Sequence, residues 1–183
     1  MLRIGIVVLG LEKWKECRTV AKTVLPYLKK IGKRPYSTSF ELIDLEKYNQ
    51  SLDGEWNLTE KGLKKFNEKD GFIFVLPTFS EEVPESYQSF FSHIHRELQH
   101  KSVMTICFGD KDEKRHTMEQ LNICLLKYDL ALPATDIFVP KYTFVEWETK
   151  PDIENMITDH VNDYLHWAMS TKYLRNIRKS LVI

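Results

Sequence analysis

The sequence predicts a doubly wound α/β fold, a five-stranded parallel sheet in the order 2-1-3-4-5 with helices on both faces. One observation is a set of short, nearly continuous apolar runs, which are typical of strands buried on both sides. The other is that these runs alternate with segments whose apolar residues recur at helical spacing. Right-handed crossovers between so few strands favour that order. A chain of 183 residues can bury a continuous core unaided, so we expect one domain over 1–183.

The strands follow from the apolar runs in chain order. Residues 4–9 read Ile-Gly-Ile-Val-Val-Leu and predict a buried first strand, whereas 40–45 includes two carboxylates and predicts a more exposed second strand. Residues 71–76 and 102–108 are almost wholly apolar and predict two further buried strands. A weaker run around 137–139 predicts the fifth.

Helices are predicted between these strands from apolar residues three or four positions apart. In the first segment Val20, Val24, Leu28 and Ile31 share a face, and Pro26 inside this pattern should kink the helix or shift its boundary. The other helices are marked by the series Tyr87, Phe90, Phe91, Ile94 and Leu98, then Met118, Leu121 and Leu125, and finally Ile153, Met156, Ile157, Val161, Tyr164 and Ala168.

Bulk composition excludes some partners. Lys plus Arg and Asp plus Glu number 26 each, so no net field draws the protein to nucleic acid or to an anionic membrane. Basic residues gather at 29–34 and 172–179, where we interpret them as solvated helix ends. The three cysteines, Cys17, Cys107 and Cys124, match neither a redox pair nor a zinc motif, which favours a reduced, cytoplasmic setting. No apolar stretch is long enough to span a membrane.

Ligands of doubly wound sheets bind beyond the carboxyl ends of the strands. The loops after the first, third and fourth predicted strands, at 10–18, 77–84 and 109–116, are therefore the expected ligand-binding edge. The first begins Gly-Leu-Glu-Lys at 10–13. The second reads Pro-Thr-Phe-Ser-Glu-Glu-Val-Pro at 77–84, and the fourth strand ends Phe108-Gly109 before an acidic turn.

The order and spacing of these loops resemble the NADPH-dependent FMN reductase family, which includes NAD(P)H:quinone reductases. That family has a Gly-Ser-x-Arg phosphate loop, of which this chain keeps Gly10. Leu11 removes a donor and Glu12 adds a charge that opposes phosphate, whereas Lys13 can supply a cation. At 77–84 both prolines and the aromatic residue of the family's flavin loop stand at matching positions. The family's glycine-rich third loop is reduced to one glycine.

The resemblance implies a flavodoxin-like fold, bound FMN, NADPH or NADH as the hydride donor, and a quinone, flavin or similar small molecule as the electron acceptor. It also implies a homodimer with the flavin close to the subunit interface. Because the flavin carries the chemistry, no catalytic residue is assigned, and the spacing of His93, His95 and His100 does not suit a metal site. The cofactor-binding residues that the resemblance assigns are Gly10, Leu11, Lys13, Cys17, Pro77, Thr78, Phe79, Ser80, Phe108 and Gly109.

The residues themselves leave two functions open, the flavin-dependent reductase and a binding module. Because the loops depart from the family's pattern, they also suit a flavodoxin-like domain that has lost flavin and acts as a ligand- or protein-binding module, with its acidic turns facing a basic partner. In that case Phe79 and Phe108 are core aromatics that cap the sheet edge.

The helical series from Tyr87 to Leu98 raises a separate expectation. It carries more aromatic side chains than one helix face usually buries, so we expect this helix to contribute to the core and also to a dimer interface.

Overall fold

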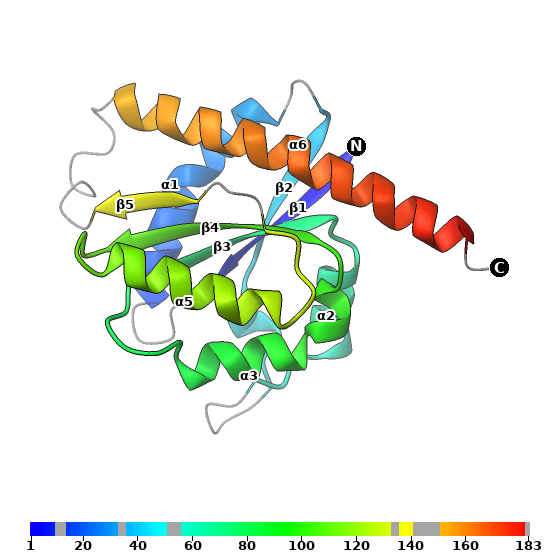
Figure 1. Cartoon of the computed structure of the whole chain (residues 1–183), viewed down its shortest axis with the longest axis horizontal. Coiled ribbons are helices and arrows are strands. Elements are labelled where there is room, and N and C mark those ends of the chain that lie inside the picture. The colour runs from blue at the N-terminus through cyan, green and yellow to red at the C-terminus, as the bar shows by residue number, and fades with distance from the viewer. Residues whose placement is uncertain (10–13, 33–35, 51–55, 133–135, 141–150, 182–183) are drawn as a thin grey trace.

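The computed structural model describes residues 1–9, 14–32, 36–50, 56–132, 136–140 and 151–181. Five parallel strands form one sheet in the order β2-β1-β3-β4-β5, which confirms the predicted fold class and strand order (Figure 1). The second strand begins two residues before the predicted one. The strands are β1 (Leu2–Val8), β2 (Thr38–Ile43), β3 (Gly71–Pro77), β4 (Ser102–Gly109) and β5 (Ile137–Pro140).

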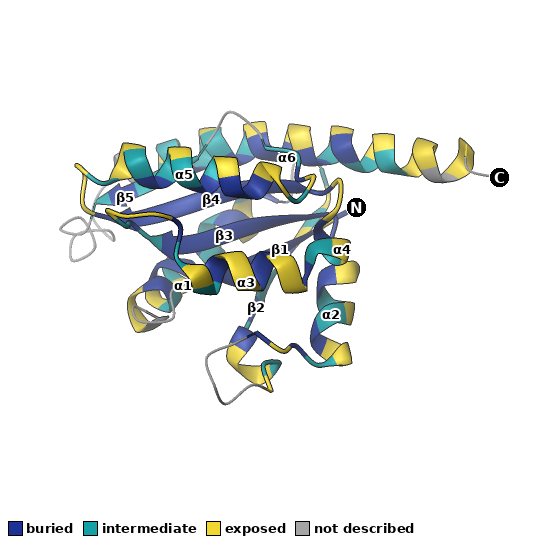
Figure 2. Cartoon of the chain, turned by 60° about the horizontal axis from the view of Figure 1, so that its bottom comes forward, coloured by how far each residue is buried: buried dark blue, intermediate teal, exposed yellow. Residues whose placement is uncertain are grey.

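Helices cover both faces of this sheet and bury two cores (Figure 2). On one face α1 (Trp14–Ile31) and α6 (Pro151–Leu181) pack against alternate residues of the strands. The strand residues that alternate with these point to the other face of the sheet, where they form the second core with the other helices. These are α2 (Glu60–Asn67), α3 (Glu85–His93), α4 (His95–Leu98) and α5 (Lys114–Leu126).

Helix α1 runs without a boundary through Pro26, so of the two outcomes expected there the shifted boundary is not observed. A proline lacks the N–H that would bond to the carbonyl four residues earlier, here that of Lys22. Both Pro26 and Lys22 are exposed, so water can satisfy that carbonyl.

The predicted helix over 87–98 is also divided, at Ile94, into α3 and α4. Its apolar series lies wholly in the second core. These side chains leave no apolar surface for the dimer interface that we expected on this helix, since each is at most 4% exposed: Tyr87, Phe90, Phe91, Ile94 and Leu98. The dimer itself stays a prediction.

The basic residues near the end of α6 are not simply solvated, as the sequence suggested. The buried carboxylate of Asp70 accepts hydrogen bonds from the Arg3 N–H and from Lys172 Nζ, both at 2.9 Å, and Arg175 lies 3.5 Å from it. Lys172 also donates to the Met1 carbonyl at 2.8 Å. These contacts fasten α6 to the amino edge of the sheet.

No helix in the described ranges combines the length and the apolar character that crossing a membrane requires.

Candidate functional site

The carboxyl edge of the sheet contains the switch point of the fold. Strands β1 and β3 are paired neighbours, yet α1 packs on one face of the sheet and α3 on the other. After β1 and after β3 the chain therefore crosses to opposite faces of the sheet. Doubly wound folds form a ligand crevice between two such strands. The predicted ligand-binding edge lies at this place.

The loops after β3 and β4 are joined through Thr78. Its N–H donates to the Phe108 carbonyl at 2.8 Å, and its buried hydroxyl donates to Glu113 Oε2 at 2.7 Å. The same hydroxyl oxygen accepts the Asp110 N–H at 3.1 Å. Gly109 has φ +143°, and a Cβ there would lie 2.2 Å from Thr78 Oγ1. Glycine is therefore required for this close approach of the two loops.

Phe79 is held by its backbone rather than by its ring. Its N–H donates to Thr117 Oγ1 and its carbonyl accepts from the same hydroxyl, both at 2.9 Å. Its half-buried ring lies edge-on to Tyr87 and to His116, with centroids 6.4 Å apart in each case. The ring packs against the second core but keeps part of its surface outside. The ring therefore combines the two roles that the sequence left open, a core aromatic and a surface that a flavin could contact.

A third contact completes what we call the loop clamp, defined as the ties between residues 78–81 and the side chains of Glu113, His116 and Thr117. His116 Nε2 donates to the Glu81 carbonyl at 2.8 Å. The three clamp side chains stand at positions i, i+3 and i+4, on one face of the start of α5. The loop after β3 is therefore fixed by the protein itself.

Sequence reasoning missed the clamp residues because it assigned ligand-binding roles only to loop positions. The signal available was the spacing of Glu113, His116 and Thr117, which places three polar side chains together at a helix start. Which loop they contact depends on the tertiary packing of α5, which spacing does not reveal.

The remaining assigned residues fall into three groups. Gly10, Leu11 and Lys13 lie outside the described residues. Pro77 is half-buried and Ser80 is exposed at the edge. Cys17 and Phe108 are at most 5% exposed and belong to the first core, so their side chains are enclosed by the protein.

The cysteines are not poised for chemistry. Burial raises the pKa of the Cys107 thiol, and the nearby Asp136 carboxylate raises it further. Burial likewise raises the pKa of Cys124. Thiolates are the reactive form, so these two buried thiols are inert.

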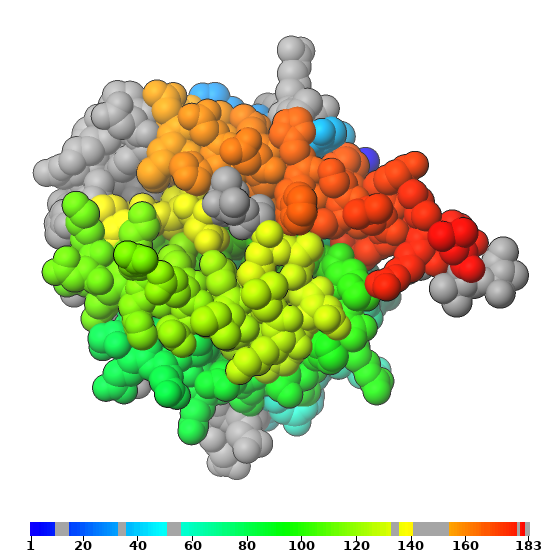
Figure 3. All heavy atoms as spheres, viewed as in Figure 1, coloured from blue at the N-terminus to red at the C-terminus, as the bar shows by residue number. Residues whose placement is uncertain are grey.

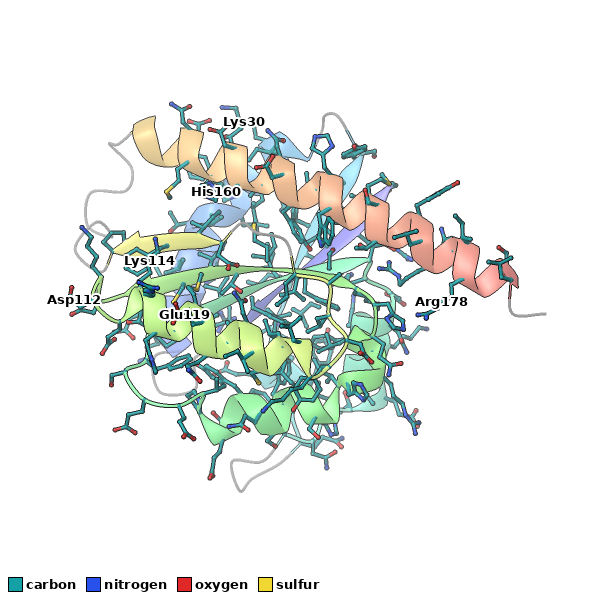
Figure 4. All side chains as sticks on the ribbon, in the orientation of Figure 1. Lys30, Asp112, Lys114, Glu119, His160 and Arg178 are labelled. Carbon is teal, nitrogen blue, oxygen red and sulfur yellow. The ribbon has the colours of Figure 1, made fainter. Side chains whose placement is uncertain are left out.

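Charge at this edge is mixed rather than purely acidic. Glu81, Glu82, Asp110 and Asp112 are exposed, but Lys111 and Lys114 stand among them. Lys114 Nζ lies 5.3 Å from the ring centroid of Phe138, and Figure 4 shows Asp112 and Lys114 at the same end of the molecule. The lysines reduce the repulsion that these four carboxylates would exert on an anionic ligand.

A further cation near the first loop is already engaged. Arg18 on α1 donates to Asp44 Oδ2 at 2.7 Å, just beyond the end of β2, and lies 3.7 Å from Glu46. Within the described ranges no three His, Cys, Asp or Glu side chains are grouped so as to hold a metal ion.

Comparison with known proteins gives a sequence relative and many structural ones. No protein-family model matches the chain. An NAD(P)H-dependent FMN reductase of Schizosaccharomyces pombe is 20% identical over 171 residues, covering 86% of this chain and 83% of that protein.

Among solved structures, an oxidoreductase from Corynebacterium diphtheriae superposes with a TM-score of 0.71 at 14% identity, over 93% of this chain and 98% of that one. The apo form of an NADH:FMN oxidoreductase gives 0.69 at 13% identity, over 93% and 90% of the two chains. The flavodoxin of Megasphaera elsdenii gives 0.53 at 14% identity, over 88% and 97%. At these identities the structural likeness establishes the fold.

Proposed function

We propose that the chain is an FMN-dependent NAD(P)H oxidoreductase, because it has the flavodoxin-like fold and is similar to an NAD(P)H-dependent FMN reductase. FMN binds at the carboxyl edge of the sheet, NADPH or NADH donates the hydride, and a quinone, flavin or similar small molecule accepts the electrons. The observation that carries the proposal is the loop clamp, which fixes the backbone from which the Phe79 ring projects at the switch point.

The residues at this edge fit the face of a flat ring. Pro77 and Phe79 offer half-exposed apolar surfaces, and the exposed hydroxyl of Ser80 follows directly. A flavin ring stacked on Phe79 and Pro77 would turn its polar edge toward Ser80. Because the clamp fixes this loop in advance, binding does not have to order it, and that saves conformational entropy.

The bound FMN would supply the redox chemistry, taking a hydride from the reduced nicotinamide and passing two electrons to the acceptor. The protein's own residues position the reactants. Lys111 and Lys114 supply positive charge beside the carboxylates for an anionic nicotinamide dinucleotide.

The proposal includes a homodimer in the cytoplasm, with residues 1–183 as one domain. Support for the compartment comes from the cysteines, because Cys17, Cys107 and Cys124 are buried and form no disulfide. A reducing environment preserves such thiols.

The direct test is a titration of the purified protein with FMN, followed by quenching of flavin fluorescence. We expect saturable quenching by FMN, and weaker quenching by riboflavin because it lacks the phosphate. Oxidation of NADPH and NADH with a quinone acceptor is then measured on the FMN-loaded protein. Absence of quenching by either flavin would overturn the proposal.

A second function is favoured by one observation, that the backbone donors of this edge are engaged within the protein. The N–H groups of Thr78, Phe79, Asp110 and Asp112 all donate to protein acceptors. These groups are then not available to the carbonyls of a flavin. This pattern suits a binding module that has lost flavin, and the same titration distinguishes it, since such a module leaves FMN fluorescence unchanged.

A further inference from the structure

The exposed large apolar side chains of the described residues lie almost entirely on two helices. Apart from Met1, every one lies on α5 or α6. They are Ile123, Leu126, Trp167, Tyr173, Leu174, Ile177 and Leu181, with exposures from 37% to 77%. Leu126, Leu174, Ile177 and Leu181 line one groove, and apolar side chains grouped in this way mark an interaction site more often than chance exposure does.

Helix α6 carries two apolar stripes. The first is buried against the sheet and includes Ile157, Val161, Tyr164 and Ala168. The second, which we call the outer stripe, consists of Trp167, Leu174, Ile177 and Leu181. Its steps of seven, three and four residues are those of the a and d positions of a coiled coil. The two stripes lie about a third of a turn apart on the helix.

The last turns of α6 lie beside His100 and residues 126–131 rather than over the sheet. Lys172 is bonded to the Met1 carbonyl at the start of β1, so the following turns pass the amino edge of the sheet. The helix extends past the rest of the molecule at this end (Figures 1 and 3). Leu174, Ile177 and Leu181 on these turns are exposed in the single chain.

A groove of about 590 Å³ runs between this overhang and the end of α5. Its apolar walls are Leu126 and Leu130 on one side and the last three residues of the outer stripe on the other. Asp129 and His100 line it as well. Arg178, labelled near the end of α6 in Figure 4, donates to His100 Nε2 at 3.0 Å, and this bond steadies the helix end beside the groove.

We propose that this groove receives α6 of a second copy of the chain, in a two-fold antiparallel pair. A heptad stripe packs best against another heptad stripe, and α6 supplies both the ridge and one wall of the groove. A two-fold axis therefore lets each helix fill the groove of the other, as a self-complementary interface requires. Charge agrees, because the overhang is basic at Arg178 while the groove offers the exposed carboxylate of Asp129.

This interface lies at the amino edge, at the opposite ends of the strands from the proposed flavin site. It is a different surface from the flavin-side interface that the family resemblance implied, so the two can form independently. The inference does not depend on flavin binding, so its test can fail while FMN binding and the reductase activity stand, and the reverse.

The first experiment measures molar mass by light scattering after gel filtration at micromolar concentration. We expect Leu174→Asp/Ile177→Asp to halve the molar mass of the parent assembly. The control is Asn176→Asp, which adds a charge on an exposed position of α6 off the outer stripe and should keep the parent's molar mass. Circular dichroism checks that all three proteins are folded. A monomeric parent, or a molar mass that the double substitution leaves unchanged, overturns the proposal.

The second experiment uses the fact that all three native cysteines are buried. Ile177→Cys introduces an accessible thiol on the outer stripe, and Asn176→Cys places one on the other side of the same turn. A short bismaleimide should link Ile177→Cys chains into covalent dimers and leave Asn176→Cys chains largely monomeric. Equal linking of the two variants, or none, contradicts the antiparallel pair.

Discussion

Two threonine hydroxyls, those of Thr78 and Thr117, join the loop after β3 to the start of α5. Thr117 is fully buried and bonds to both the N–H and the carbonyl of Phe79. A single side chain thus sets the backbone of the aromatic residue at the proposed flavin site. At the scale of single residues, the clamp is the feature with the clearest consequences.

Replacing Thr117 with valine keeps the shape of the side chain and removes its hydroxyl. The Phe79 N–H then loses its partner, which costs about 1–3 kcal/mol when the group stays buried. We expect lower stability in urea denaturation and weaker quenching of FMN. The control is Thr19→Val, which removes an exposed hydroxyl bonded to the Lys15 carbonyl and should change stability by less than about 0.5 kcal/mol. Equal effects of the two substitutions would argue against the clamp.

Phe79→Ala should leave the chain folded and abolish FMN binding. The ring is half-buried, so its loss removes less core contact than the loss of a fully buried ring such as Phe91 would. Thermal unfolding and FMN titration are measured on the same preparation. Unfolding of the variant would instead assign Phe79 to the core.

The predicted phosphate loop allows a substitution that should improve binding. Leu11→Ser/Glu12→Thr adds a hydroxyl donor and removes a carboxylate that would repel a phosphate. At an effective dielectric of about 20 such a repulsion is worth about 4 kcal/mol at contact before screening. Even a part of it shifts affinity tenfold, at about 1.4 kcal/mol per decade. The double variant should therefore quench FMN fluorescence at lower protein concentration than the parent. No quenching by either protein would favour the binding module.

Among the elements, the strands were the most predictable from sequence. Burial on both faces gives the runs at 71–76 and 102–108 a signal that needs no tertiary information. Helix α2 was missed because it is short and only Leu63 and Phe66 are apolar within it. The helix is held by contacts that apolar spacing does not reveal. At its start the Thr59 side chain accepts the Gly62 N–H, and near its end Phe66 packs against Phe72.

For helix α6, the spacing of apolar residues predicts the helix but not the contacts that hold its C-terminal part. The buried stripe ends at Ala168, and the basic residues at 172–179 were expected to form the end of the same helix, which the structure continues to Leu181. What holds this end is the pairing of Lys172 and Arg175 with Asp70, about a hundred positions away in the chain. Local sequence could show the positive charges but not the buried carboxylate that holds them.

Asp70→Ala tests this fastening of α6. It leaves Lys172, Arg175 and the Arg3 N–H without their shared acceptor, and breaking a largely buried ion pair in this way costs about 3 kcal/mol. Urea denaturation should show that loss. Glu119→Ala breaks the exposed pair with Arg115 and should cost less than about 1 kcal/mol. A loss as small for Asp70→Ala would mean that packing alone holds the helix.

At the scale of the whole molecule, the two ends of the sheet have different tasks. The carboxyl edge carries the loop clamp and the proposed flavin site, and the amino edge carries the Asp70 contacts and the overhang of α6. The fold and the place of the ligand edge followed from the sequence. The contacts that join its loops did not, because they connect residues whose proximity only the packing of α5 decides.

Binding of FMN at this carboxyl edge is measured most directly by the visible spectrum of the protein after loading. The purified chain is incubated with FMN, passed through gel filtration to remove free flavin, and examined before and after addition of NADPH or NADH without oxygen. We expect the absorption of oxidised flavin to elute with the protein and to be bleached by the reduced nicotinamide. Protein that elutes without flavin absorption, from a sample shown to be folded, would mean that this edge does not bind FMN.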